Sequence, residues 1–189
     1  MNNVLKTSLI ILANFICAAT YAATFSYDQI QLVVGQTITE TSFSSQATDS
    51  KFARGSASLG IGDVLFLAAD GLANNVNSGR SYAFGFGVHL PVNNQADVVA
   101  AINIVNASIN STGHTESDAG ISSSASLRLR VVPKFELTGG IAYVSVFNNK
   151  TTGIIYGANL YLTDSASLVF QGNQSDKSQS YAAGLRINY

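Results

Sequence analysis

The feature that most constrains the fold is a strict alternation of large apolar residues with very small or polar ones. In residues 81–90 the large members alternate with Ser, Ala, Gly and His. These large residues are Tyr82, Phe84, Phe86, Val88 and Leu90. A period of two residues is that of a β-strand whose two faces meet different surroundings. Because the same pattern recurs in residues 121–131 and 135–143, the sequence predicts an all-β fold.

The small-residue face of these segments indicates an enclosed surface. In a soluble sheet the polar face carries Lys and Glu, whereas here it carries Gly, Ser, Ala and a few Arg. Charged residues make up 11% of the chain, well below the roughly 25% of soluble globular proteins. Outside the N-terminus, no apolar run approaches the about 20 residues of a membrane-spanning helix. We therefore expect a closed antiparallel transmembrane β-barrel, because a backbone in lipid must pair all its polar groups internally.

Turn signals divide the chain into about ten strands, with eight as the alternative. We expect the strands at residues 25–37, 51–60, 64–74, 80–90, 96–109, 119–131, 135–147, 152–162, 166–173 and 179–189. The second, fourth, sixth and eighth strands end in short connections, and the other connections are mostly longer and rich in Ser, Thr and Asn. Short periplasmic turns and longer extracellular loops are typical of bacterial outer-membrane barrels. An even number of strands then places both termini in the periplasm.

The N-terminus has the composition of a secretory signal peptide. Lys6 precedes an apolar core at residues 9–16, and small residues follow up to Ala22. We expect cleavage after about Ala22, so that residues 1–22 are removed and residues 23–189 form the barrel.

Cys17 raises the alternative of a lipoprotein signal. The residue before a lipidated cysteine is normally small, whereas here it is the bulky Ile16. Cleavage after Ala22 would leave a mature chain without cysteine, and therefore without disulfides or thiolate metal ligands.

The last predicted strand ends on an aromatic residue and carries its apolar side chains on one face. These residues are Tyr181, Ala183, Leu185, Ile187 and Tyr189. The strand resembles the C-terminal signature of Gram-negative outer-membrane proteins, and the whole pattern is similar to the small outer-membrane barrels related to OmpX and the transmembrane part of OmpA. The resemblance implies an outer-membrane location, contact with lipid, and recognition of Leu185, Ile187 and Tyr189 by the barrel-assembly machinery. The chain departs from that family in having ten expected strands rather than eight, which weakens any transfer of function.

No residue pattern in the chain indicates catalysis. His89 lies on the small-residue face with no carboxylate assignable beside it, so a structural role is favoured over proton transfer or metal binding. His114, Glu116 and Ser117 supply a base, an acid and a nucleophile, but such close neighbours in sequence seldom form a triad. Acidic loop residues lack calcium-ligand spacing, and the scattered basic residues do not suit a nucleic-acid binder. We expect no enzyme, cofactor, metal or nucleic acid.

Four charged residues are expected to point into the lumen: Arg128, Arg130, Glu136 and Arg186. A tight turn around Pro133 would place Arg130 opposite Glu136, where the two can form an ion pair. As structure, the four residues are a polar network that links the barrel walls. As function, the excess of arginine makes a constriction that weakly favours anions.

The function that we expect from the sequence is a non-enzymatic outer-membrane barrel, either structural or a narrow channel for small solutes. The alternative is a surface-recognition or adhesion barrel that binds an extracellular ligand through the loops at residues 38–50, 110–118 and 174–178. We also expect aromatic girdles, with Tyr27, Phe135 and Tyr189 at the periplasmic interface and Tyr143 or Phe147 at the outer one. Seven side chains are expected to face lipid: Tyr82, Phe84, Phe86, Leu127, Leu129, Leu160 and Leu185.

Overall fold

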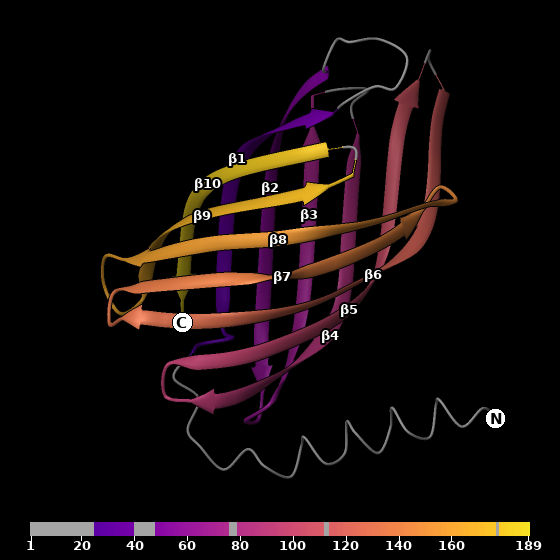
Figure 1. The fold of residues 1–189 in the computed structure, drawn as a ribbon. Coiled ribbons are helices and arrows are strands. Elements are labelled where there is room, and N and C mark those ends of the chain that lie inside the picture. The colour runs from indigo at the N-terminus through magenta and orange to yellow at the C-terminus, as the bar shows by residue number, and fades with distance from the viewer. Residues whose placement is uncertain (1–24, 40–47, 76–78, 112–113, 177) are drawn as a thin grey trace, which may run out of the picture.

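The structure, a computed structural model, describes residues 25–39, 48–75, 79–111, 114–176 and 178–189. The expected signal peptide and most of the expected first loop lie outside these residues. The described chain forms a closed antiparallel barrel of ten strands (Figure 1). The strands are β1 (Gln29–Thr39), β2 (Thr48–Ile61), β3 (Leu65–Asn74), β4 (Arg80–Asn93), β5 (Ala96–Ser111), β6 (His114–Val132), β7 (Phe135–Val146), β8 (Asn149–Tyr161), β9 (Ala166–Ser175) and β10 (Ser178–Asn188).

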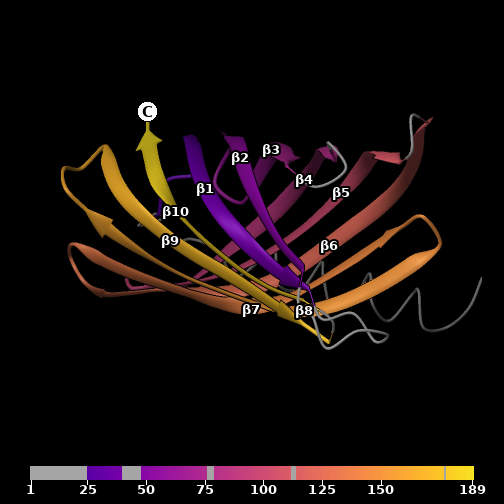
Figure 2. The same cartoon turned by 90° about the horizontal axis from the view of Figure 1, so that it is seen from above.

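Each strand pairs with its neighbours in sequence, and β1 pairs with β10 to close the barrel (Figure 2). The closing ladder runs in unbroken register from Gln29 opposite Asn188 to Thr39 opposite Ser178. The prediction of a ten-stranded barrel is therefore confirmed. No helix among the described residues is long and apolar enough to cross a membrane.

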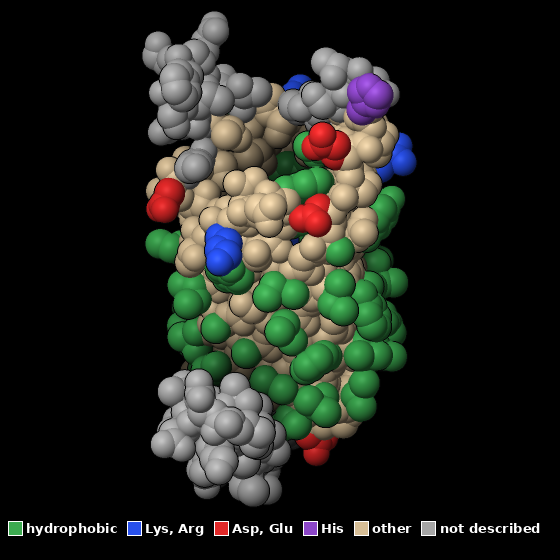
Figure 3. Space-filling view, turned by 90° about the vertical axis from the view of Figure 1, so that its right-hand side faces the viewer, with side chains coloured by type: hydrophobic (Ala, Val, Ile, Leu, Met, Phe, Trp, Pro, Cys, Tyr) green, Lys and Arg blue, Asp and Glu red, His purple; other side chains and the backbone are tan. Residues whose placement is uncertain are grey.

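The alternation in the sequence separates the outside of the barrel from its lumen. Large apolar side chains cover the outer surface, where they form a broad band (Figure 3). All seven residues expected to face lipid are exposed there, for example Phe84 at 61% and Leu185 at 55%. Their outward orientation is therefore confirmed. A register slip of one residue would have turned all of them into the lumen.

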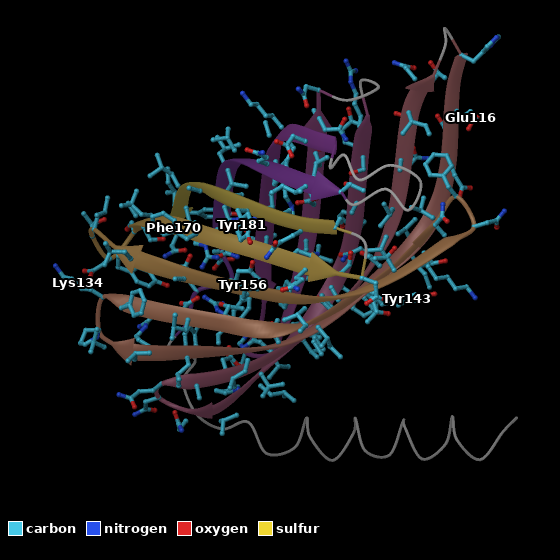
Figure 4. The ribbon with its side chains drawn as sticks, turned by 45° about the horizontal axis from the view of Figure 1, so that its top comes forward. Glu116, Lys134, Tyr143, Tyr156, Phe170 and Tyr181 are labelled. Atoms are coloured by element: carbon cyan, nitrogen blue, oxygen red, sulfur yellow. The ribbon has the colours of Figure 1, made fainter. Side chains whose placement is uncertain are left out.

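The two rims of the barrel differ. We call the end that holds the short connections at residues 62–64, 94–95, 133–134 and 162–165 the turn rim, and the opposite end the loop rim. Figure 4 shows Lys134 at the turn rim and Glu116 toward the loop rim. At the loop rim, long connections separate only β1 from β2 and β3 from β4. Residues Phe147 and Asn148 form a tight hairpin turn with φ of 52° and 54°, as a type I′ turn requires.

The longest strands, β5 and β6, project past their neighbours at the loop rim. The pairing of β5 with β4 ends at Ser108, and the pairing of β6 with β7 begins at Ile121. Residues 109–111 and 114–120, which we call the arm, therefore have a strand partner on one side only: residues 109–111 pair with 114–116, and residues 117–120 pair with 105–108 of β5. The prediction of a loop at residues 110–118 was wrong, because β5 extends to Ser111 and β6 begins at His114. The arm extends beyond the closed part of the barrel, so neither of its faces borders lipid or a packed lumen. Polar residues can therefore occupy both faces of a strand there.

The first strand begins at Gln29 rather than at residue 25. Residues Phe25–Asp28, which we call the plug, leave the sheet and fold into the lumen at the turn rim. The expected strand at residues 25–37 was therefore wrong over its first four positions. Near the middle of β1, β9 and β10, Val33, Val169 and Ala182 form a second small core with Phe52 of β2.

Candidate functional site in the barrel lumen

The plug fills the lumen at the turn rim with two aromatic rings. Phe25 and Tyr27 are buried, with 4% and 6% of their surfaces exposed. The Tyr27 ring stacks on His89 with the centroids 3.9 Å apart, and it lies 5.0 Å from the ring of Phe66. The prediction that Tyr27 belongs to the periplasmic girdle was wrong, because Tyr27 precedes β1 and turns inward.

A carboxylate lies beside His89, contrary to the sequence interpretation. Asp97 Oδ2 lies 3.3 Å from His89 Nδ1 and accepts a hydrogen bond from Tyr27 Oη at 2.5 Å. His89 points inward from β4 and Asp97 from β5, and both side chains are buried. The hairpin register places Asp97 opposite Pro91, one inward position along from His89. The signal was therefore present in the sequence, in the short turn and the alternation on each side of it.

Glu136 is the centre of a second buried cluster. Its side chain is 0% exposed, and both carboxylate oxygens accept hydrogen bonds from Arg128, each at 3.0 Å. Asn159 Nδ2 and Tyr161 Oη donate to the same carboxylate at 2.8 Å each. Arg186 Nη1 lies 3.6 Å from Glu136 Oε1. The cluster therefore links β6, β7, β8 and β10 across the lumen.

Arg130 does not pair with Glu136, so that expectation was wrong. The register was predicted correctly, with Arg130 opposite Glu136 and Leu129 opposite Leu137. However, the Arg130 guanidinium lies 5.0 Å from the centroid of Phe25 and 5.2 Å from that of Tyr161. The plug supplies one of these rings, and cation–π contact holds Arg130 away from the carboxylate.

Arg128 joins the two clusters. Its guanidinium lies 4.7 Å from the Phe25 centroid and 4.9 Å from the Tyr27 centroid while it holds Glu136. Arg186 donates to Gln31 Oε1 at 3.0 Å, and Gln31 Nε2 donates to Gln171 at 2.9 Å. Polar contacts thus continue across the seam between β1 and β10.

A cavity of about 430 Å³ occupies the lumen on the loop-rim side of these clusters. Its lining mixes apolar side chains with polar ones, and the polar ones include Asn103, Ser122, Ser124 and Gln171. Two arginines also line it: Arg186 at the boundary with the Glu136 cluster, and Arg54, which pairs with Asp70 at 2.5 Å. The small side chains in this part of the lumen leave space unfilled, whereas the buried clusters fill the lumen near the turn rim. The lumen is therefore hollow toward the loop rim and filled toward the turn rim.

The residues of the expected assembly signal lie on the outer surface of the last strand. Leu185 and Ile187 are each 55% exposed, and Tyr189 is 65% exposed. The backbone N–H of Tyr189 donates to Asp28 O at 3.1 Å, and its hydroxyl donates to Ser58 O at 3.2 Å. The end of the chain is thus fixed to the base of the plug.

In the described part of the chain, no group of three or more His, Cys, Asp or Glu side chains could hold a metal ion. His114 and Glu116 lie in the arm, and the alternation of the strand directs Ser117 to the opposite face. These three residues do not converge.

Comparisons with known proteins give the fold. No family model and no curated protein sequence matches the chain. Among solved structures, the KdgM porin in complex with disordered oligogalacturonate is 7% identical, with a TM-score of 0.52 over 85% of this chain and 99% of that one. The NanC porin is 11% identical, with a TM-score of 0.50 over 84% and 100%. The chain has an outer-membrane β-barrel fold.

The fold is shared by proteins with different activities. The outer-membrane protease OmpT from Escherichia coli is 10% identical, with a TM-score of 0.51 over 87% of this chain and 95% of that one. At such identities the similarity carries the architecture and not the activity. Function must therefore be argued from the lumen and the rims.

Proposed function

We propose that the chain is a non-enzymatic outer-membrane channel for small solutes, with a lumen that is closed at the turn rim in this conformation. One observation carries the proposal: a cavity of about 430 Å³, lined in part by hydroxyl, amide and arginine side chains, lies inside the barrel wall and ends on the buried clusters. A barrel with a purely structural role has no need for this space, and core-forming side chains would fill it. Ten strands enclose much less space than the 16 to 18 of general porins, so the path is narrow.

The charges in the lumen favour anions. Toward the turn rim the lumen holds Arg128, Arg130 and Arg186 against the carboxylates of Glu136 and Asp97. The three arginines against two carboxylates leave one excess positive charge in this set. A narrow path lined by such a set admits small anions more readily than cations.

The architecture supports a proposal for the placement of the chain in the cell. We propose that residues 1–22 direct export and are removed, and that the turn rim and both termini face the periplasm. The apolar outer band contacts lipid, and the exposed Leu185, Ile187 and Tyr189 serve the barrel-assembly machinery as the terminal signal.

Planar-bilayer recording of the refolded protein tests the channel. We expect discrete single-channel steps and, under a potassium chloride gradient, a reversal potential of the sign for anion preference. Folding is checked in the same sample by heat-modifiable migration on a gel. A folded protein that stays silent would overturn the proposal, and a cation preference would overturn the role of the arginines.

The arm supports a second candidate function, surface recognition. Residues 109–111 and 114–120 stand beyond the neighbouring strands, so their outer backbone edges have no strand partner. A free strand edge is a ready template for an added strand. Removal of residues 110–115 would abolish binding to cells if the arm is the recognition element, and it would leave conductance unchanged if the barrel is a channel.

Catalysis is not part of the proposal. The one described histidine–carboxylate pair, His89 with Asp97, is buried at 3% and 0% exposure beneath the plug. A substrate cannot reach it without displacing Tyr27, which stacks directly on the imidazole.

A further inference from the structure

We infer that the plug, Phe25–Asp28, is a displaceable gate that closes the periplasmic end of the lumen. This inference rests on the proposed channel function and adds its regulation. The site is the socket that receives the plug, formed by His89, Asp97, Arg128 and Phe66 around Tyr27.

The plug is held in the socket mainly by side chains. Tyr27 stacks on His89 at 3.9 Å and donates to Asp97, while Arg128 and Arg130 lie 4.7 and 5.0 Å from the centroid of Phe25. These contacts come from strands β4, β5 and β6, which face the plug across the lumen. The plug therefore bridges the barrel interior instead of lying along its wall.

The backbone of the plug is largely separate from the sheet. Both ladders of β1, to β10 and to β2, begin at Gln29. Before that residue, Ser58 Oγ donates to Tyr27 O at 2.6 Å, and Asp28 is fixed at its carboxylate by Gly60 N and at its carbonyl by Tyr189 N. Phe25 and Tyr27 can therefore leave the lumen by rotation about an anchored Asp28, and the barrel ladders stay intact.

The socket is incompletely satisfied while the plug is in place. Three buried polar atoms around the plug make no hydrogen bond: Asp97 Oδ1, Arg130 Nε, and His89 Nδ1, whose 3.3 Å contact with Asp97 Oδ2 lacks hydrogen-bond geometry. Such atoms carry a desolvation penalty that water would remove. Withdrawal of the plug admits water to all three, and this gain offsets part of the loss of aromatic contact. The two states therefore differ less in free energy than the burial of two rings alone implies.

Withdrawal also completes the path. The cavity already reaches Arg186 and Asn159, which contact the Glu136 cluster. On its other side, the cluster contacts the plug through Arg128. When the plug is removed, solvent enters from the turn rim up to Arg128, so the cluster becomes the narrowest point.

Single-channel recording of the full chain with Tyr27→Ala and Tyr27→Phe tests the gate. We expect Tyr27→Phe, which loses only the hydrogen bond to Asp97, to raise the ratio of open to closed time about fivefold to tenfold. Tyr27→Ala also loses the ring stack and should raise it further. Tyr82→Ala is the matched control, because it removes an equal side chain that is 60% exposed on the outer surface, and it should behave as wild type.

The outcomes separate the gate from the channel. A conducting wild type with unchanged Tyr27→Phe and Tyr27→Ala variants would overturn the gate and leave the channel in place. Silence of all folded proteins, variants included, would overturn the channel and the gate together. If Tyr27→Ala does not fold, the fold-neutral Tyr27→Phe decides alone, since an unchanged open fraction in that variant contradicts the gate.

Discussion

Arg128 donates two hydrogen bonds to Glu136 across the β6–β7 hairpin, although Arg130 is the residue directly opposite that glutamate. Arg186 also approaches the same carboxylate. The buried Arg128 and the partly buried Arg186 thus share one buried negative charge.

Replacement of Glu136 by Gln should lower the free energy of unfolding by about 3 kcal/mol, because it leaves the buried Arg128 and the partly buried Arg186 without a counter-charge. The measurement is the urea unfolding midpoint of the protein in lipid vesicles. Glu116→Gln is the control, since Glu116 is exposed in the arm, and it should change stability by less than about 0.5 kcal/mol. Equal midpoints for both variants would contradict the buried network.

A double-mutant cycle should assign the partner of Glu136. We expect a coupling energy above about 1 kcal/mol between Arg128→Gln and Glu136→Gln, and less than about 0.5 kcal/mol between Arg130→Gln and Glu136→Gln. The four unfolding free energies of each cycle are measured under one set of conditions. A larger coupling for Arg130 would show that the ion pair follows the strand register and not the diagonal contact.

The orientation of the barrel can be measured with two cysteine variants at opposite rims. In a chain with Cys17 replaced by Ser, Glu116→Cys should react with a membrane-impermeant maleimide on intact cells. Lys134→Cys, at the turn rim, should react only after the outer membrane is permeabilised (Figure 4). The reverse pattern would place the turn rim outside and would contradict periplasmic termini.

The outer and inner faces of the barrel wall should differ in their access to lipid-phase and aqueous quenchers. Phe84→Cys, on the outer surface, should carry a fluorophore that lipid-phase quenchers reach, and Ser124→Cys should carry one that only aqueous quenchers reach. A fluorophore at Ser124 that responded to the lipid quencher would mean that no aqueous cavity lies behind that strand.

The strands were predictable because two environments act on one backbone. Large apolar side chains are favoured on the lipid face, and small side chains are favoured in the narrow lumen. The alternation in residues 81–90 therefore indicates both the strand and the face that points inward. The hairpin at Pro133 was predictable for the same reason, since the alternation on each side fixes its register.

The partner of Glu136 was not predictable from register alone. Pairing across a ladder fixes Cα positions, whereas an arginine side chain spans enough distance to reach a diagonal neighbour. The choice between Arg128 and Arg130 depends on Phe25, which occupies the space beside Arg130. The sequence predicts a strand at Phe25, because the alternation of aromatic and polar residues over 25–28 is equally compatible with a strand and with a plug.

The seam between β1 and β10 makes the barrel a single cooperative unit. It joins residues from the two ends of the chain, with Gln29 opposite Asn188 and a side-chain contact between Gln31 and Arg186. Until the last strand is in place, two strand edges remain unpaired, which a bilayer interior does not tolerate. A chain without β10 would leave the edges of β1 and β9 unpaired. Loss of a single terminal strand should therefore abolish membrane insertion instead of producing a smaller barrel.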